Sequence, residues 1–250
     1  MVDTPMASIS SLPDTLVLWD VDHTLIDNGG ISKETYRLAF ELLVGRVPEV
    51  QPATDGRTDF QIMRELLVAN SVDATEYVEI SQFEGVLGVA MRENASGLPR
   101  RGRVLPGVVE ALAMLAAVPT VVQSVLTGNI AHNAAVKLGA FGLDERVDME
   151  VGGFGSDDKI RSNLVDAARR KVSLKYGTTF DRLSTILVGD TLLDVQAAHD
   201  GGAKIISVAT GVHSAEQLRE AGADVVLDSL ADTERFMTEL LHLRTDTTVA

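Results

Sequence analysis

The chain has 250 residues, no cysteine, and 22 basic against 36 acidic side chains, which gives a formal charge of −14. A chain of this length is expected to hold one large domain or a core with a smaller insert. The lack of cysteine excludes disulfides, thiolate metal sites and a thiol nucleophile. The excess of acid argues against a nucleic-acid-binding protein, because that affinity comes from clustered Lys and Arg.

The sequence predicts neither a membrane span nor a secretion signal. Its longest apolar stretch, 108–126, is interrupted by Glu110, Pro119 and Gln123, whereas a membrane helix needs about 20 consecutive apolar residues. The N-terminal segment 1–14 has no basic region and no apolar run of the kind found in signal peptides. We therefore expect a cytoplasmic globular protein, and no pattern in the sequence indicates its oligomeric state.

Short apolar runs rich in β-branched residues alternate with segments of helical spacing. The runs are flanked by Gly or Asp and predict buried strands at 16–19, 120–126, 185–188, 204–208 and 224–227. Apolar residues recurring every third or fourth position predict helices at 107–117, 159–175 and 229–242. This alternation is typical of βαβ units, so we expect an α/β protein with a Rossmann-like, doubly wound parallel sheet.

The segment between the first two strands departs from this alternation. It contains no strand-like run, and three helices are predicted instead, at 32–44 with Ser32 as N-cap, 58–69 and 75–92. We interpret 29–103 as a helical cap domain inserted into a core made of 14–28 and 104–243. The segment 97–106, rich in Gly, Arg and Pro, is expected to be the hinge that returns the chain to the core.

Polar residues follow three of the predicted strands, at 20–24, 127–129 and 189–194. In an open parallel sheet, ligands bind beyond the carboxyl ends of the strands. All three segments are therefore expected to face one crevice.

Carboxylates gather at this crevice. Asp20 and Asp22 lie two residues apart in extended chain and point to one side, and Asp190 ends another strand at the same edge. Three buried carboxylates repel one another unless a cation compensates. A hard divalent ion with oxygen ligands, typically Mg²⁺, would resolve this repulsion and would also bridge a phosphate. A single Asp at a strand end is often only a cap, but the combined set favours a metal site.

In chain order, segments 20–25, 127–129 and 189–194 resemble the motifs of the haloacid dehalogenase-like hydrolase superfamily. Segment 105–108, with the leucines that follow it, resembles the re-entry into the core in the phosphoglycolate phosphatase-like branch. That branch carries a helical cap at the same place in the chain. The resemblance covers about residues 15–230, and four motifs in this order are far more specific than any one of them.

The resemblance implies a Mg²⁺-dependent phosphatase that hydrolyses a small phosphorylated metabolite, phosphoglycolate-like, through an aspartyl-phosphate. Asp20 would be the nucleophile, and Asp22 the general acid that later acts as base. The magnesium would be held by Asp20, the backbone carbonyl of Asp22 and Asp190, with Asp194 binding directly or indirectly.

The resemblance also implies a phosphate site formed by Thr127 and the amides of Gly128 and Asn129. A cation should hold nucleophile and phosphate together. Lys159 is the preferred candidate. Arg161 remains a rival, because the proline that often follows this lysine in the family is absent here.

Three further residues are candidates for contacts with substrate. Arg57 and Thr58 lie in a loop resembling the cap loop that dips toward the active site, where Arg57 could pair with an anionic substrate tail. A plain loop with a helix N-cap explains the same residues equally well. His23 stands where the family commonly has Gly, and it would either contact substrate or only face the cap.

Two rival functions remain at this point. A β-phosphoglucomutase-like phosphomutase would use the same residues and return the phosphoryl group to its product. A receiver-like regulatory domain also phosphorylates an Asp on a doubly wound sheet, but it needs neither Asp22 nor a cap.

Overall fold

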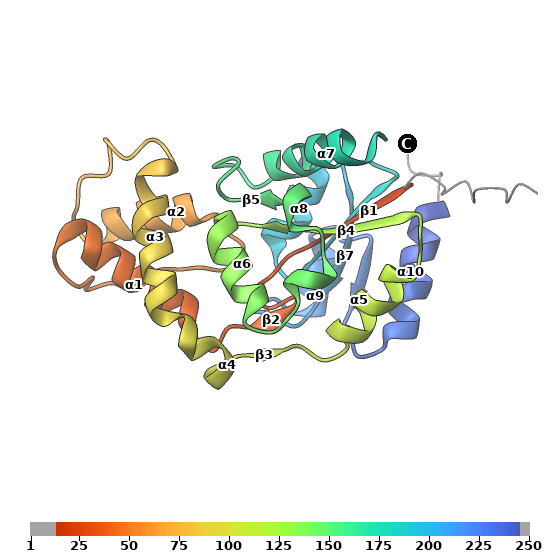
Figure 1. Ribbon diagram of the computed structural model, residues 1–250, viewed down its shortest axis with the longest axis horizontal. Coiled ribbons are helices and arrows are strands. Elements are labelled where there is room, and N and C mark those ends of the chain that lie inside the picture. The colour runs from red at the N-terminus through yellow and green to blue at the C-terminus, as the bar shows by residue number, and fades with distance from the viewer. Residues whose placement is uncertain (1–13, 246–250) are drawn as a thin grey trace, which may run out of the picture.

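A six-stranded parallel sheet forms the centre of the computed structural model, which describes residues 14–245 (Figure 1). Segment 1–13, which carries most of the region searched for a signal peptide, lies outside the described residues. The strand order is β5-β4-β1-β6-β7-β8. The strands are β1 (Thr15–Trp19), β4 (Val121–Thr127), β5 (Gly153–Phe154), β6 (Thr185–Gly189), β7 (Lys204–Val208) and β8 (Val225–Leu227). The predicted α/β fold with a Rossmann-like core is confirmed, and all five predicted strands are present.

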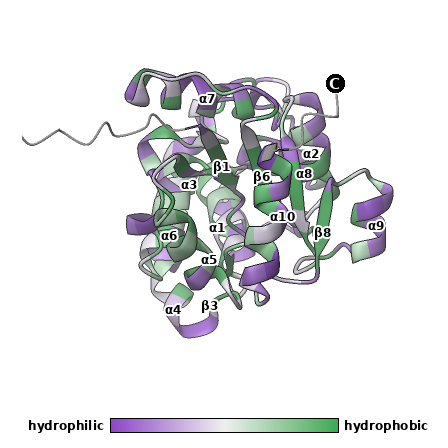
Figure 2. Ribbon diagram, turned by 90° about the vertical axis from the view of Figure 1, so that its right-hand side faces the viewer, coloured by the Kyte–Doolittle hydropathy of each residue, from purple (hydrophilic) through white to green (hydrophobic). Residues whose placement is uncertain are grey.

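Helices cover both faces of the sheet because alternate residues of each strand point to opposite faces. On β1, Val17 and Trp19 belong to one apolar cluster and Leu16 and Leu18 to the other. In Figure 2, α7 lies on one side of β1 and β6, and α5 lies on the other. The first cluster includes residues of α5 (Val108–Ala116), α6 (Ala131–Gly139) and α10 (Thr233–Thr245), and the second includes residues of α7 (Asn163–Tyr176), α8 (Leu192–Asp200) and α9 (Ala215–Glu220).

A separate group of helices lies beside the sheet, at the left of Figure 1. It consists of α1 (Ile31–Val44), α2 (Asp59–Ala69), α3 (Ser81–Asn94) and the short α4 (Leu98–Arg101). The first three pack around an apolar cluster that includes Phe40, Met63 and Phe83. This arrangement supports the proposed cap at 29–103, whose exact boundaries stay a prediction.

Two helix starts differ from the prediction. Gly30, with φ of 84°, is the N-cap of α1, so the predicted capping role of Ser32 is wrong and its side chain is buried within the helix. Helix α3 begins at Ser81 rather than near 75. The preceding turn is held instead by Gln82, whose Oε1 accepts from the N–H groups of Val78 and Glu79.

The two linkers between cap and core pair with each other. Strand β2 (Ile26–Asp27) runs antiparallel to β3 (Arg103–Val104). An ion pair of 3.0 Å between Arg103 Nη2 and Asp27 Oδ2 adds to this pairing. The predicted hinge at 97–106 therefore holds α4 and β3 rather than irregular chain.

Candidate active site

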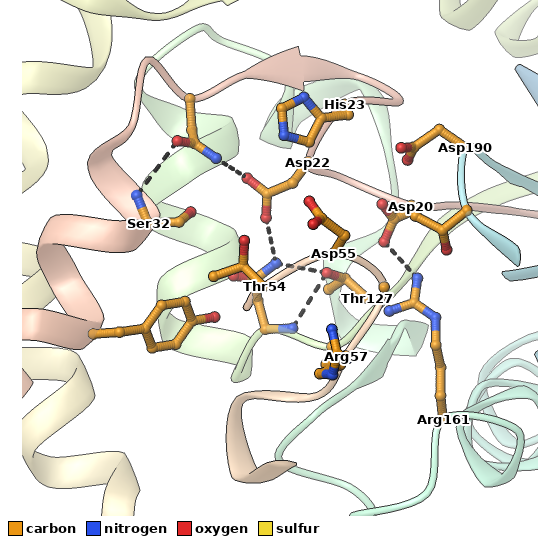
Figure 3. Close-up of a pocket in the computed structure, with 16 residues that line it drawn as sticks. Asp20, Asp22, His23, Ser32, Thr54, Asp55, Arg57, Thr127, Arg161 and Asp190 are labelled. Atoms are coloured by element: carbon orange, nitrogen blue, oxygen red, sulfur yellow. Dashed lines mark hydrogen bonds and ion pairs between the residues drawn. The ribbon is translucent and has the colours of Figure 1, made fainter. Parts of the chain in front are cut away.

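The carboxyl ends of the three central strands meet at one small cavity (Figure 3). Asp20 follows β1, Thr127 ends β4, and Asp190 follows β6. All three line a cavity whose free volume is about 40 Å³. The structure thus brings together segments that are more than 50 residues apart in the sequence.

Asp20 is buried beside a cation. Its backbone N–H donates to the carbonyl of Val188 on β6 at 2.8 Å, and its Oδ1 accepts from Arg161 Nη2 at 2.7 Å. Burial raises the pKa of Asp20 to about 7, although the charge of Arg161 opposes the shift and the carboxylates of Asp194 and Asp22 add to it. Arg161 alone therefore does not compensate the carboxylates gathered here, which is the setting for a metal cation.

Asp190 packs against the backbone of Gly211, on the side of Asp20 opposite Arg161 (Figure 3). Its Oδ1 accepts from Thr24 Oγ1 at 3.0 Å. A Cβ atom on Gly211 would lie 1.8 Å from Asp190 Oδ2, so this approach needs glycine. Burial, together with the charges of Asp194 and Asp20, raises the pKa of Asp190 well above its usual value.

Carboxylate oxygens of Asp20, Asp190 and Asp194 lie within 4.8 Å of one another. These hard oxygen donors match the ligands that Mg²⁺ prefers. Asp194, however, already has partners on both oxygens. Its Oδ1 accepts from Arg161, and its Oδ2 accepts from Thr191 N at 2.9 Å in the capping box that starts α8. This geometry favours an indirect role for Asp194, in which it holds Arg161 in place.

Arg161, and not Lys159, is the cation at the cavity. Arg161 is 8% exposed, lines the cavity and contacts Asp20 and Asp194. Its Nε is buried and has no hydrogen-bond partner among the described residues. Lys159 turns toward the cap, where its Nζ lies 3.2 Å from Glu79 Oε2 and 5.2 Å from the centre of the Phe60 ring. The sequence-based preference for Lys159 over Arg161 is therefore reversed.

The residues after β4 form a connected group. Asn129 Nδ2 donates to Thr127 Oγ1 at 2.7 Å and to Asp22 Oδ2 at 3.0 Å. Gly128 backs onto the cap loop, since a Cβ atom there would lie 2.1 Å from the carbonyl oxygen of Arg57. Thr127, Gly128 and Asn129 thus line the cavity as predicted for a phosphate site, although their role in binding stays a prediction.

Asp22 accepts three side-chain hydrogen bonds. Its Oδ1 accepts from Asn28 Nδ2 at 2.7 Å, and its Oδ2 accepts from Asn129 and from Lys137 Nζ, the latter at 2.6 Å. Burial acts to raise the pKa of Asp22, but the charge of Lys137 and these hydrogen bonds outweigh burial and lower the pKa to about 2. These three contacts hold the carboxyl group of Asp22 at the edge of the cavity.

Lys137 is a residue of this site that was not predicted from the sequence. The residue lies on α6 with a side chain that is 1% exposed. Ile130 and Ala134 are buried and lie seven and three positions before Lys137, which is the spacing of one helix face. A lysine on the apolar face of a helix next to a predicted phosphate motif was the signal that could have identified it.

The cap contributes one loop to the cavity, together with Ser32 and Tyr36 of α1. Thr54, Asp55, Gly56 and Arg57 line it, and in Figure 3 Asp55 faces Asp22 and Thr127. Arg57 Nε lies 3.3 Å from Glu65 Oε2.

Of the other two substrate-contact candidates, His23 reaches the cavity and Thr58 does not. Thr58 is fully buried, caps α2 and donates to the carbonyl of Lys159 at 3.1 Å. This agrees with the plainer interpretation of Thr58, as a helix N-cap. His23 lines the cavity and has φ of 62°, a conformation that glycine adopts more easily.

Comparisons with other proteins agree with the fold and with the resemblance seen in the sequence. A family model described as HAD-hydrolase-like matches residues 159–233, which include Arg161 and Asp190. The chain is 26% identical over 231 residues to "Probable phosphatase IndB" of Dickeya dadantii (strain 3937), which covers 91% of this chain and 95% of that relative.

Solved structures share the fold at low identity. A "Putative beta-phosphoglucomutase" from Bacteroides vulgatus aligns with a TM-score of 0.67 and 18% identity over 94% of this chain and 92% of that one. A "predicted phosphoglycolate phosphatase" from Haemophilus somnus 129pt aligns with a TM-score of 0.60 and 17% identity over 92% of this chain and 100% of that one. Among residues 14–245, no helix is long and apolar enough to cross a membrane. The chain is thus similar in sequence and fold to haloacid dehalogenase-like hydrolases, as the resemblance of its motifs implied, and the expectation of a phosphatase-type enzyme is confirmed.

Proposed function

We propose that this protein is a Mg²⁺-dependent phosphatase that hydrolyses a phosphomonoester of a small metabolite through an aspartyl-phosphate on Asp20. The observation that carries the proposal is the position of Asp20 at the end of β1, buried between Arg161 on one side and Asp190 on the other. A second carboxylate, Asp22, stands two residues further on and lines the same cavity. A nucleophile with an adjacent acid–base group is what two-step phosphoryl transfer requires.

The residues fit magnesium. Asp20, the backbone carbonyl of Asp22 and Asp190 would hold it, and Asp194 would support them through Arg161 and Thr191. When bound, the ion would neutralise charge on the phosphoryl oxygens and offset the repulsion between the carboxylates.

The chain's own groups would carry both steps. An oxygen of Asp20 attacks phosphorus, the bond from phosphorus to the leaving oxygen breaks, and the proton on that oxygen comes from Asp22. Asp22 then takes a proton from the water that attacks the aspartyl-phosphate, which releases inorganic phosphate and restores Asp20. Arg161 and the Thr127–Asn129 segment would bind the phosphoryl oxygens throughout.

The size of the cavity supports a small substrate. The free volume of the cavity, about 40 Å³, suits a phosphoryl group and leaves little space for the rest of the molecule unless the cap moves. The phosphoglycolate-like substrate and the cytoplasmic location expected from the sequence both remain predictions. The charge of −14 gives no reason to expect a nucleic-acid partner.

The test is Mg²⁺-dependent release of phosphate from 4-nitrophenyl phosphate and from a panel of metabolite phosphates. Asp20→Asn should abolish turnover, and undiminished turnover by this variant would contradict the nucleophile assignment. Asp22→Asn should reduce turnover strongly. Stable phosphorylation without turnover would favour the receiver-like alternative, and interconversion of hexose phosphate isomers would favour a mutase.

A further inference from the structure

Lys137 is a buried ammonium group whose two hydrogen-bond partners both belong to the candidate active site. Its Nζ lies 2.6 Å from Asp22 Oδ2 and 2.6 Å from Asn129 Oδ1. The side chain reaches them from α6, where its neighbours Ala134 and Leu138 belong to the apolar core. The lysine therefore extends from the packed interior to the edge of the cavity.

Packing alone does not explain a lysine at this position. Removing an ammonium group from water costs several kcal/mol, and a well-packed apolar pair is often as stable as a buried ion pair or more so. A methionine would fill a similar volume without that cost. The charge is thus more consistent with a role in the site than with a role in the core.

The contacts of Lys137 fix two groups at once. Without it, Asp22 Oδ2 would keep one donor, Asn129 Nδ2, and the carbonyl oxygen of the Asn129 amide would lose its ammonium partner. Asn129 Nδ2 also donates to Thr127 Oγ1. Lys137 consequently links the orientation of the proposed acid–base carboxyl to that of the proposed phosphate-binding segment.

We propose that Lys137 is a positioning residue that holds the carboxyl of Asp22 where it can exchange a proton with the leaving oxygen of the substrate. This inference rests on the proposed phosphatase function. In the step concerned, the Asp20–phosphorus bond forms, the bond to the leaving group breaks, and one proton passes from Asp22 to the leaving oxygen. Lys137 forms no covalent bond and keeps its protons.

The first experiment compares two substrates that differ in their need for a proton. The 4-nitrophenolate ion leaves readily without protonation, whereas phenolate is a poorer leaving group and depends more on general acid. Lys137→Met should lower kcat/KM for phenyl phosphate by roughly 10- to 100-fold and that for 4-nitrophenyl phosphate distinctly less. Lys137→Arg, which keeps the charge, should recover part of the loss. Equal losses on both substrates, or no loss on either, would overturn the proposal.

A double-mutant cycle tests whether Lys137 acts through Asp22. In an Asp22→Asn background, adding Lys137→Met should lower kcat/KM far less than it does in the wild type, because only the contact with Asn129 is then left to lose. Losses that multiply would show that Lys137 acts independently and would overturn the inference. This double variant has no buried unpaired charge, so it stays informative even if Lys137→Met alone does not fold.

Lys204 provides a matched control. It is a second buried lysine, on β7, and its Nζ donates to the carbonyl of Leu243 at the opposite end of the sheet from the cavity. Lys204→Met should leave the ratio of the two substrates unchanged even where it lowers thermal stability. A wild-type protein that turns over neither substrate would instead count against the proposed function itself.

Discussion

Core and cap contribute to the cavity in opposite ways. The core supplies Asp20, Thr127 and Asp190, which are 1 to 8% exposed and follow directly from paired strands. The cap supplies Asp55 and Arg57 from a half-buried loop, and Arg57 pairs with the exposed Glu65. The sheet thus buries the proposed reactive groups, whereas the contacts proposed for the rest of the substrate come from a more exposed loop.

The largest effect is expected in the core, at the cation. Arg161→Met should lower kcat/KM by roughly 100- to 1000-fold, because it removes the charge that faces both Asp20 and the transferred phosphoryl group. Lys159→Met, two residues away, should stay within about threefold of wild type, since its ammonium pairs with Glu79 of the cap. Steady-state kinetics with 4-nitrophenyl phosphate decides between them, and the reverse order would restore Lys159 as the phosphate-binding cation.

The next largest effect is expected on the free energy of unfolding, at a residue that links the cap to the core. Asp59, at the start of α2, accepts from Tyr36 OH at 2.5 Å and from the N–H of Ile130 in the core at 2.9 Å. Asp59→Ala leaves both donors buried without partners and should lower the free energy of unfolding by about 2–4 kcal/mol. Asp59→Asn can still accept from Ile130 and donate to the tyrosine oxygen, so its loss should be smaller. Equal losses in chemical denaturation would contradict this account.

The difference in stability between wild type and Asp59→Asn should also depend on pH. Burial raises the pKa of Asp59 in the folded protein, against the hydrogen bonds from Tyr36 and Ile130 that lower it. The folded state therefore holds the proton more tightly than the unfolded state, and the contribution of Asp59 to stability declines as the pH rises above 3.8. Relative to wild type, Asp59→Asn should gain stability as the pH rises above 3.8, until Asp59 is ionised in the folded protein as well. A stability difference that does not change as the pH rises from 3.8 would refute the shift.

A smaller effect is expected where the cap loop touches the core. A Cβ atom on Gly128 would collide with the backbone of Arg57, so Gly128→Ala should push the loop outward and lower kcat/KM by roughly 10-fold. Gly85→Ala on α3 meets no atom within 4 Å and should leave the kinetics unchanged. It should also raise stability by about 0.5–1 kcal/mol, because alanine favours the helix. Equal kinetics of the two variants would show that the loop does not need this contact.

The smallest change should come from the loop's own side chain. Arg57→Gln should alter KM by only about two- to fivefold, since its charge is already paired with Glu65 at the surface. The change should depend on the substrate, being larger for phosphoesters with a second anionic group. A uniform loss in kcat across a substrate panel would instead place Arg57 with the core residues.

The sequence was most informative where burial and chemistry coincide. Apolar runs followed by Asp20, Thr127 and Asp190 predict both the strands and the edge at which the site forms, because parallel strands bring their carboxyl ends together. Strand β5 and the pair β2–β3 have two residues each, which is too short for any periodicity.

Long-range contacts account for the remaining differences in the site. The choice between Lys159 and Arg161 depends on Glu79, a cap residue 80 positions earlier in the chain, and no local pattern contains it. For Lys137 the helical pattern could have indicated burial, but only the folded α6 shows that its partner is Asp22. The N-cap of α1 is Gly30 in a left-handed conformation, and not Ser32. The path of the linker decides where this helix starts, and helix propensity does not contain that information.

The pairing of β2 with β3 makes the two points of cap insertion near neighbours. Asp27 and Arg103 are direct partners in that ladder, so residues 28–102 leave the core and return to it at neighbouring positions. The junction itself is tight, since a Cβ atom on Gly29 would lie 2.5 Å from the carbonyl carbon of Arg101 and one on Gly102 would lie 2.6 Å from the carbonyl oxygen of Asp27. An unrelated cover of different length, spliced in at these two glycines, would leave the order β4-β1-β6 and its cluster of carboxylates in place. The cap is thus joined to the core through one short paired junction, whose position does not depend on what is inserted there.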